Sequence, residues 1–301
     1  VDGSFVMTLT SSGPAWPDSP CHSTALRDLG EPDLPAAWAL SNALQWPHRL
    51  ADWQAFLQLG EGRAAIHGQD LAAVGMRWAW GEQAVSIGVV IVASAWRGQG
   101  WGRRMMQALA QGLDDRALML HATEEGRPLY EKLGYEPVGT VHQHQGLARQ
   151  AAGAALPHGW HLRQARPGEA PSLAVLDEAA RGFPRGRLIA HCLAEAVQAM
   201  VLEDSRGACG FAAMRRFGRG LVIGPVVAPD RVLAQALIDR LLGSVAGQFV
   251  RIDLPGDPVM AGWLADRGLS QVGVTTAMVR GRRPRGDGVL FGHALVAQAL
   301  G

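Results

Sequence analysis

The sequence has few cysteines, few tyrosines and no long apolar run. Its three cysteines, Cys21, Cys192 and Cys209, are an odd number without metal-ligand spacing. They predict reduced thiols in a cytoplasmic protein and no metal site. No apolar stretch reaches about 18 residues, so we expect no transmembrane helix. The formal net charge of +1, without a concentrated basic stripe, argues against nucleic acid or a membrane surface as a partner.

The chain is long enough and apolar enough for two domains. Of its 301 residues, 48% are hydrophobic and 18% are charged, which is a globular composition. The segment Gln150 to His158 is small, polar and closed by a proline, which predicts a linker. We therefore predict one domain over residues 22–150 and a second over 159–301. Residues up to about Pro20, rich in Ser, Pro and Gly, are predicted to be poorly ordered.

A glycine-rich turn lies at the centre of the first predicted domain, within Gly88 to Arg103. Val89 to Ala93 is a short β-branched run that predicts a buried strand, and an amphipathic helix is predicted after the turn. Gly98, Gly100 and Gly102 would let backbone N–H groups approach a ligand and would direct the first N–H groups of the helix toward it. This pattern predicts an anion site suited to a pyrophosphate.

Two motifs in this region carry a family resemblance. The first is Arg-x-x-Gly-x-Gly at Arg97, Gly100 and Gly102, after a strand that ends in Val-x-Ser. The second is the block Leu120 to Gly139, which contains LYEKLGY. Together they resemble the acetyl-CoA motifs of the GNAT superfamily of N-acetyltransferases, whose usual proline in that strand is Ser94 here. The resemblance implies an α/β fold in which a mostly antiparallel, splayed sheet is flanked by helices.

The resemblance also implies which residues bind acetyl-CoA, the expected co-substrate. Backbone groups of the strand would pair with the pantetheine amides as an extra strand, and the glycine turn would hold the pyrophosphate. The predicted cofactor-binding residues are Val90, Ile91, Val92, Arg97, Gly98, Gln99, Gly100, Trp101, Gly102, Arg103, Thr123 and Tyr130.

Tyr130 is the predicted catalytic residue. It matches the family tyrosine that hydrogen-bonds the coenzyme sulfur and protonates the departing thiolate. A phenol with the ordinary pKa near 10 faces a thiol of pKa about 8.5, so direct proton transfer is uphill by roughly 2 kcal/mol and hydrogen bonding must do much of the stabilising. The alternative is a tyrosine that only packs against pantetheine. Tyr135, the other tyrosine of the chain, is expected to anchor the core.

The acceptor side of the reaction is less specified by the sequence. An amine with a Lys-like pKa of about 10.4 is mostly protonated at pH 7, so some group or water must take its proton. None of the candidate bases matches a family motif, and the base is left open among Glu82, His121, Glu124, His142 and His144. Arg49 is a candidate acceptor contact, and core packing is expected for the tryptophans on the same side, Trp46, Trp53, Trp78 and Trp80.

The order of predicted elements repeats after the linker, which indicates a duplication. A shift of 134 residues places Val92 on Val226 and Arg97 on Arg231. The same shift replaces the three glycines of the turn and the tyrosine by Val232, Ala234, Ala236 and Leu264. The second domain is therefore predicted to be a degenerate GNAT-like domain without cofactor, so we expect one acetyl-CoA per chain. Its tail, Leu290 to Gly301, is predicted to be a closing apolar helix.

These observations predict an acetyl-CoA-dependent N-acetyltransferase that transfers acetyl to a primary amine of a small molecule or peptide by direct attack. The alternatives are an acyl-CoA sensor without turnover and another acyl transfer on the same tandem fold. The second domain is expected to wall the acceptor side, with a contribution from the turn Phe183 to Arg187. Alternatively, it only stabilises the first domain or forms a homodimer. The acceptor and the acyl length are left open.

Overall fold

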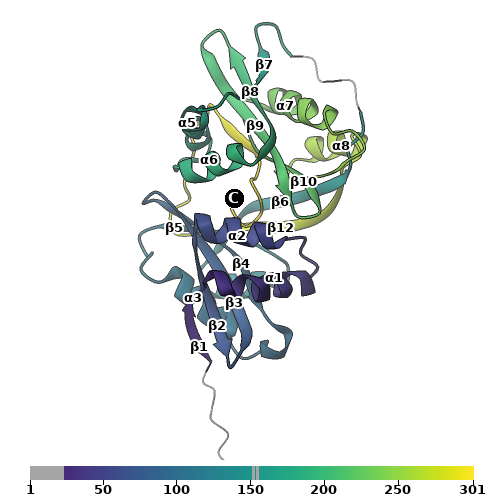
Figure 1. The fold of residues 1–301 in the computed structure, drawn as a ribbon. Helices are drawn as coiled ribbons and strands as arrows, with labels where there is room; N and C mark the ends of the chain where they lie inside the picture. Colours follow the sequence, from purple (N-terminus) through teal and green to yellow (C-terminus); the bar gives the residue numbers. More distant parts are fainter. Residues whose placement is uncertain (1–23, 151–152, 154–155) are drawn as a thin grey trace, which may run out of the picture.

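The computed structural model describes residues 24–150, 153 and 156–301, which form two halves stacked end to end (Figure 1). The expected disorder up to Pro20 and the expected thiol of Cys21 lie outside the described residues. None of the helices in the described part is long and apolar enough to cross a membrane.

The first half follows the predicted order of elements. The strand, two helices and further strands before the glycine turn all form, and α2, β2 and β3 each end directly before a glycine. Its elements are β1 (Ala25–Asp28), the 3-10 helix η1 (Glu31–Asp33), α1 (Leu34–Ala43), α2 (Leu50–Leu59), β2 (Glu61–His67), β3 (Asp70–Trp80), β4 (Ala84–Val92), the 3-10 helix η2 (Ser94–Trp96), α3 (Trp101–Ala110), β5 (Ala117–Ala122), α4 (Arg127–Lys132) and β6 (Glu136–Leu147).

The second half repeats this order and adds one strand. Its elements are β7 (His161–Gln164), α5 (Ala170–Arg181), α6 (Gly186–Ala194), β8 (Ala196–Asp204), β9 (Gly207–Phe217), β10 (Gly220–Ala228), α7 (Arg231–Gly243), β11 (Phe249–Pro255), α8 (Pro258–Asp266), β12 (Ser270–Arg280) and β13 (Phe291–Ala294).

The helix predicted for the tail, Leu290 to Gly301, is wrong. The tail instead forms β13, which pairs antiparallel with Val226 to Ala228 at the end of β10, and then continues without regular structure into the space between the two halves, as Figure 1 shows. The edge of β10 is free there because β10 pairs with β11 only over Leu221 to Ile223. Pairing with β13 satisfies backbone groups that burial would otherwise leave unpaired, and this outweighs the helical apolar period.

The strands of both halves form one continuous sheet. Its order is β1-β2-β3-β4-β5-β12-β6-β11-β10-β9-β8-β7, with β13 beside β10 off this path. All neighbours are antiparallel except β4 with β5 and β10 with β11. Strand β12 of the second half lies between β5 and β6 of the first, and β6 lies between β12 and β11. The packing therefore crosses the predicted boundary, which falls between β6 and β7.

The pairing of β6 with β12 has a local two-fold symmetry. Val141 of β6 pairs with Thr275 of β12, and the shift of 134 residues relates these same two positions. The flanking pairs, His142 with Val274 and Thr140 with Thr276, are exchanged by the same shift. This register supports the duplication inferred from the sequence, because equivalent strands of two copies meet around a common axis.

Helices cover both faces of the sheet in each half. In the first half, Val74, Met76 and Trp78 of β3 pack with α1 and α2 in one core, whereas Ala73 packs with α3 in another. This separation follows from the alternation of side chains along a strand. The core beneath α1 and α2 also contains Val296 and Leu300 of the tail, so residues from both halves build it.

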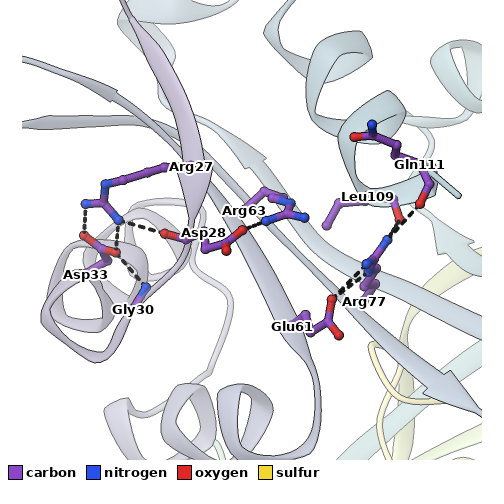
Figure 2. Close-up of polar contacts among 9 residues, drawn as sticks. All are labelled: Arg27, Asp28, Gly30, Asp33, Glu61, Arg63, Arg77, Leu109 and Gln111. Atoms are coloured by element: carbon purple, nitrogen blue, oxygen red, sulfur yellow. Dashed lines mark hydrogen bonds and ion pairs between the residues drawn. The ribbon is translucent and has the colours of Figure 1, made fainter.

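Arginine contacts fasten α3 and the outer strands to the sheet (Figure 2). Arg77 on β3 donates to the carbonyl oxygens of Leu109 at 3.1 Å and Gln111 at 3.3 Å, where α3 ends, and it also pairs with Glu61 on β2 at 2.8 Å. A cation is favourable at a helix C-terminus, where carbonyl groups lack partners. These contacts hold α3, whose other end carries the glycine turn. Figure 2 also shows the pairs Arg27–Asp33 and Arg63–Asp28.

Candidate functional site

Strands β4 and β5 run side by side and then diverge, which opens the sheet at its centre. They pair only from Ala84 to Ser86 on β4. Further along β4, Val89 and Val90 lie opposite the single residue Gly75 of β3, and Val89 has a φ of +46°. This bulge places a β-branched residue in a conformation that such residues rarely adopt, and bulges of this kind often lie beside functional sites. Because the pairing with β5 ends at Ser86, the rest of the β4 backbone has no partner on β5.

The glycine turn forms as predicted between this open strand and α3. Gly98 has a φ of +74° and Gly100 a φ of +82°, and no atom lies within 4 Å of the position that a Cβ would take on either residue. Helix α3 begins at Trp101, and its first backbone N–H groups have no partner within the helix. The turn therefore combines open space with unpaired donors, which suits an anionic group.

A cleft of about 510 Å³ lies over the open strand and the glycine turn; we call it the glycine-turn cleft. Every predicted cofactor-binding residue lines it except Gln99. The Gln99 side chain turns back and donates to the carbonyl oxygen of Ala95 at 3.2 Å, so its cofactor contact stays a prediction. Trp101 lines the cleft while its indole packs in the core beneath α3.

Tyr130 lines the same cleft from the short helix α4. Its ring lies edge-on to that of Tyr135, with 6.1 Å between the ring centroids. Burial raises the pKa of Tyr130 to about 12, so its hydroxyl stays protonated at neutral pH. Tyr135 is 3% exposed, as expected for a core anchor, and its buried hydroxyl has no hydrogen-bond partner among the described residues.

A second cavity of about 240 Å³ lies where the two halves meet; we call it the junction pocket. The two cavities have several lining residues in common, including Gly88, Val89, His121 and Thr123 of the opened sheet. The second half contributes Phe217, Arg251, Gly273, Val274, Thr275, Ala297, Gln298 and Ala299. The tail reaches the opening itself, because a Cβ on Gly88 would lie 3.0 Å from the Cα of Ala299.

His121 is the one candidate base that lines both cavities. Its Nδ1 lies 2.6 Å from the carbonyl oxygen of Gln298. A carbonyl only accepts hydrogen bonds, so Nδ1 carries the proton and Nε2 of the neutral ring holds the lone pair. Burial lowers the pKa of His121, which keeps the ring neutral at pH 7.

The other four candidate bases line neither cavity. Glu82 and Glu124 are exposed, and the ring of His142 is hydrogen-bonded to Thr140 on its own strand and to Gln271 on β12. His144 is 1% exposed, and neither ring nitrogen has a partner among the described residues. Across the described part of the chain, no three His, Cys, Asp or Glu side chains are grouped to hold a metal ion.

The acceptor-side residues have mixed outcomes. Trp53, Trp78 and Trp80 are buried in the core as expected, whereas Trp46 lines both cavities. Arg49 binds Asp52 at 2.6 Å and the carbonyl oxygen of Arg216 at 2.9 Å, so it joins the two halves and lines neither cavity.

The turn Phe183 to Arg187 does not reach the junction pocket. Arg185 is 1% exposed, pairs with Asp177 at 2.8 Å, and donates to the carbonyl oxygen of Gly301 at 2.5 Å. Arg187 donates to the carbonyl oxygen of Gln58 at 2.9 Å. The turn therefore holds the tail and the interface in place instead of contacting an acceptor.

Sequence reasoning missed the residues that reach the pocket from far along the chain. His48 follows Pro47 in the connection between α1 and α2, Arg251 lies on β11, and Gln298 lies in the tail. Only the fold brings them together, because the strand exchange and the path of the tail have no local signal. The one hint was a polar glutamine within an apolar tail.

The equivalent place in the second half is filled by the chain itself. Strand β13 pairs with the edge of β10 that corresponds to the open edge of β4. At the start of α7, the carboxylate of Asp230 accepts a hydrogen bond from the N–H of Leu233 at 2.9 Å. This side chain places a negative charge where the first half offers free donors, so a phosphate would meet repulsion there.

Comparisons with known proteins agree with these two halves. Residues 44–151 and residues 173–292 each match a family model described as acetyltransferase (GNAT) domain. The chain is 31% identical over 174 residues to Uncharacterized N-acetyltransferase YitH of Bacillus subtilis, a match that covers 57% of this chain and 61% of that protein. It is 25% identical over 256 residues to Holothin acyltransferase of a Pseudoalteromonas species, covering 83% of this chain and 85% of that protein.

Solved structures share the fold over nearly the whole chain. A putative acetyltransferase from Pyrococcus horikoshii has a TM-score of 0.74 at 18% identity and covers 96% of this chain and 99% of its own. A tandem GNAT protein from the clavulanic acid biosynthesis pathway has a TM-score of 0.57 at 12% identity and covers 85% of this chain and 98% of its own. At these identities the likeness concerns the fold alone.

Proposed function

Because the chain consists of two GNAT acetyltransferase domains in tandem, we propose that its first half binds acetyl-CoA and transfers the acetyl group to an amine held in the junction pocket. The observation that carries this proposal is the meeting of the two cavities in the gap between β4 and β5, with His121 and Thr123 lining both. Donor and acceptor can then approach one another from opposite sides of the opened sheet.

The glycine-turn cleft fits the proposed donor. The edge of β4 that faces β5 has no strand partner at Val90 to Val92 and offers the groups needed to pair with pantetheine amides. The turn at Gly98 and Gly100 leaves the space that a pyrophosphate needs. Bound acetyl-CoA would supply an activated acyl thioester. The filled edge of β10 and the carboxylate of Asp230 support a stoichiometry of one acetyl-CoA per chain.

His121 would accept the proton that nitrogen loses, and Tyr130 would stabilise the negative charge that develops on sulfur. As the acyl group moves to nitrogen, the nitrogen loses a proton, which the neutral His121 can accept on Nε2. The carbon–sulfur bond breaks at the same centre, and Tyr130 would donate a hydrogen bond to the sulfur as negative charge develops there. The backbone carbonyl of Gln298 holds the ring of His121, so the tail of the second half orients the proton acceptor.

The second half would act as the wall of the acceptor site. Eight of the residues that line the junction pocket belong to it: Phe217, Arg251, Gly273, Val274, Thr275, Ala297, Gln298 and Ala299. This supports the expectation that the cofactor-free copy covers the acceptor side. A test that separates the halves is unsuitable, because β12 pairs with β5 and would leave that strand as an exposed edge.

A thiol-release assay with acetyl-CoA against a panel of amines, together with calorimetry, tests this function. We expect one acetyl-CoA site per chain and turnover with at least one amine. His121→Asn keeps a donor for the Gln298 carbonyl and removes the base, so kcat should fall about 10² to 10⁴ with unchanged acetyl-CoA affinity. Tight binding without turnover on any amine would favour the sensor alternative, and two sites per chain would contradict the cofactor assignment.

A further inference from the structure

The charges around the junction pocket restrict the amine that it can take. The ionisable side chains that line it are all bases, namely His48, His121 and Arg251. No carboxylate is among its lining residues in the described part of the chain. An alkylammonium ion entering the pocket would lose its hydration without gaining a counter-charge, and an unpaired buried cation is strongly disfavoured.

The carboxylate that contacts residues of the pocket wall already accepts hydrogen bonds from them. Asp253 is fully buried, and Arg251 donates to it from Nε at 3.1 Å and from Nη2 at 2.8 Å. The side chain of Gln298 approaches the same carboxylate at 3.4 Å. Asp253 therefore neutralises Arg251 and is screened from the pocket by two residues that line it.

The groups left without partners in the pocket are uncharged. Nδ1 of His48 and Oγ1 of Thr275 are buried and have no hydrogen-bond partner among the described residues. Burial lowers the pKa of His48 to about 4, so its ring is neutral at pH 7. Trp46 and Phe217 add aromatic walls. Such a pocket suits a flat, uncharged molecule, because its aromatic walls and neutral polar side chains offer contacts that bury no charge.

We propose that the acceptor is an amine that is neutral at pH 7, of the arylamine, heteroaryl amine or enamine class. This inference rests on the proposed function and names the substrate class of the same site. An alkylamine with a Lys-like pKa is neutral in only about one molecule in 2,500 at pH 7, whereas a weakly basic amine is neutral throughout. His121 then accepts only the proton that nitrogen releases as its bond to the acyl carbon forms.

Aniline and cyclohexylamine test the proposal, because they share a six-membered ring and differ in the charge of nitrogen. At saturating acetyl-CoA and pH 7 we expect kcat/KM for aniline to exceed that for cyclohexylamine by at least about tenfold. Between pH 7 and pH 9 the value for cyclohexylamine should rise about tenfold per pH unit, and the value for aniline should stay flat. Calorimetric titration of each amine into the protein saturated with CoA, which cannot react, gives a second readout with the same order.

A charge-insertion pair locates the effect in the pocket. Gln143 lines the junction pocket, whereas Gln111 is an exposed residue at the end of α3 that lines neither cavity. Gln143→Glu should tighten cyclohexylamine binding at least about tenfold and weaken aniline binding, whereas Gln111→Glu should change neither. Equal effects of the two variants would overturn the assignment of the pocket.

Two results would overturn the substrate class while the proposed function stands. One is a kcat/KM for cyclohexylamine at pH 7 that equals or exceeds the value for aniline. The other is the absence of binding and turnover with aniline and 2-aminothiazole in a protein that binds acetyl-CoA and acetylates an alkylamine. Failure of the function itself would differ from both, because no amine would then release thiol from acetyl-CoA.

Discussion

Replacing Tyr130 by Phe tests the chemistry of the proposed donor site most directly. Burial raises the pKa of this phenol to about 12, whereas a thiol has a pKa of about 8.5. Direct proton transfer to the thiolate would therefore be uphill by about 3.5 pKa units, or roughly 5 kcal/mol. That is steeper than the value for an unperturbed phenol, so in the proposed reaction Tyr130 would act mainly as a hydrogen-bond donor whose proton stays on oxygen.

The expected size of the effect follows from this role. Loss of one donor to a developing anion typically lowers kcat by about 10² to 10³, and we expect about a hundredfold for Tyr130→Phe. Because the bond strengthens only as charge develops on sulfur, acetyl-CoA affinity should change little. Stopped-time thiol release gives kcat, and calorimetry gives the affinity.

Tyr135→Phe is the matched control, since it removes the other tyrosine hydroxyl of the chain. That hydroxyl is buried and has no hydrogen-bond partner among the residues that the structure describes, so its loss should leave kcat unchanged and should not destabilise the fold. A Tyr130→Phe enzyme within about twofold of the wild type would refute the hydrogen-bond role and leave Tyr130 with packing alone. An equal loss in both variants would point to a disturbed aromatic pair instead.

Three further predictions use other parts of the molecule. Gly100→Val should abolish acetyl-CoA binding in calorimetry. Gly112 has a similar φ of +74° but lies outside the glycine-turn cleft, so Gly112→Val should cause similar backbone strain and leave acetyl-CoA binding intact. Burial lowers the pKa of His48 to about 4 from 6.5 in the unfolded chain, so the unfolded state binds a proton more readily and the free energy of unfolding falls as the pH drops from 6.5 toward 4. In urea unfolding, the free energy of unfolding of the wild type should fall by roughly 3 kcal/mol more than that of His48→Gln between pH 7 and pH 4. An equal fall in both proteins would contradict this. Leu300→Ala, at a site 4% exposed in the core shared by both halves, should cost about 2 to 5 kcal/mol, and tryptophan fluorescence and far-UV circular dichroism should still report one transition.

Local signals in the sequence were sufficient for most of the fold. The strand run before Gly98, the glycine turn and the helix after it were predictable because each depends on residues within a few positions. The second half was predictable for the same reason, and the pairing of Val141 with Thr275 agrees with a shift of 134 residues at β6 and β12. The shift is not constant, because α3 begins at Trp101 and α7 at Arg231. Residues 232, 234 and 236, which were placed opposite the three glycines of the turn, therefore lie inside α7. The tail was mispredicted because its structure depends on a distant free edge on β10, which no local period encodes.

The two cavities of the candidate site differ in the same way, since local motifs predict one of them and not the other. Most of the glycine-turn cleft comes from two segments, residues 87–103 and 120–132, and each of them contains one of the two motifs, so eleven of the twelve predicted cofactor-binding residues line it. The junction pocket combines Trp46, His121, Arg251, Thr275 and Gln298, which are brought together by the strand exchange and by the path of the tail. His121 could be named as a candidate from the sequence, but only the structure shows that it lines both cavities and that its Nδ1 contacts the Gln298 carbonyl.

The difference between the two halves can be traced to one segment at the end of the chain. Residues 291–294 close the open edge of β10, and residues 295–301 continue to the first half, where Ala299 contacts Gly88 and Gly301 is held by Arg185. Under the shift of 134 residues, the counterpart of β13 is Pro157 to Trp160, which leads the chain into β7. That stretch is needed as a connection, so it does not fill the edge of β4. The same duplication thus leaves one half open for a cofactor and gives the other half a strand that closes it, while the remaining tail lines the pocket beside the open half.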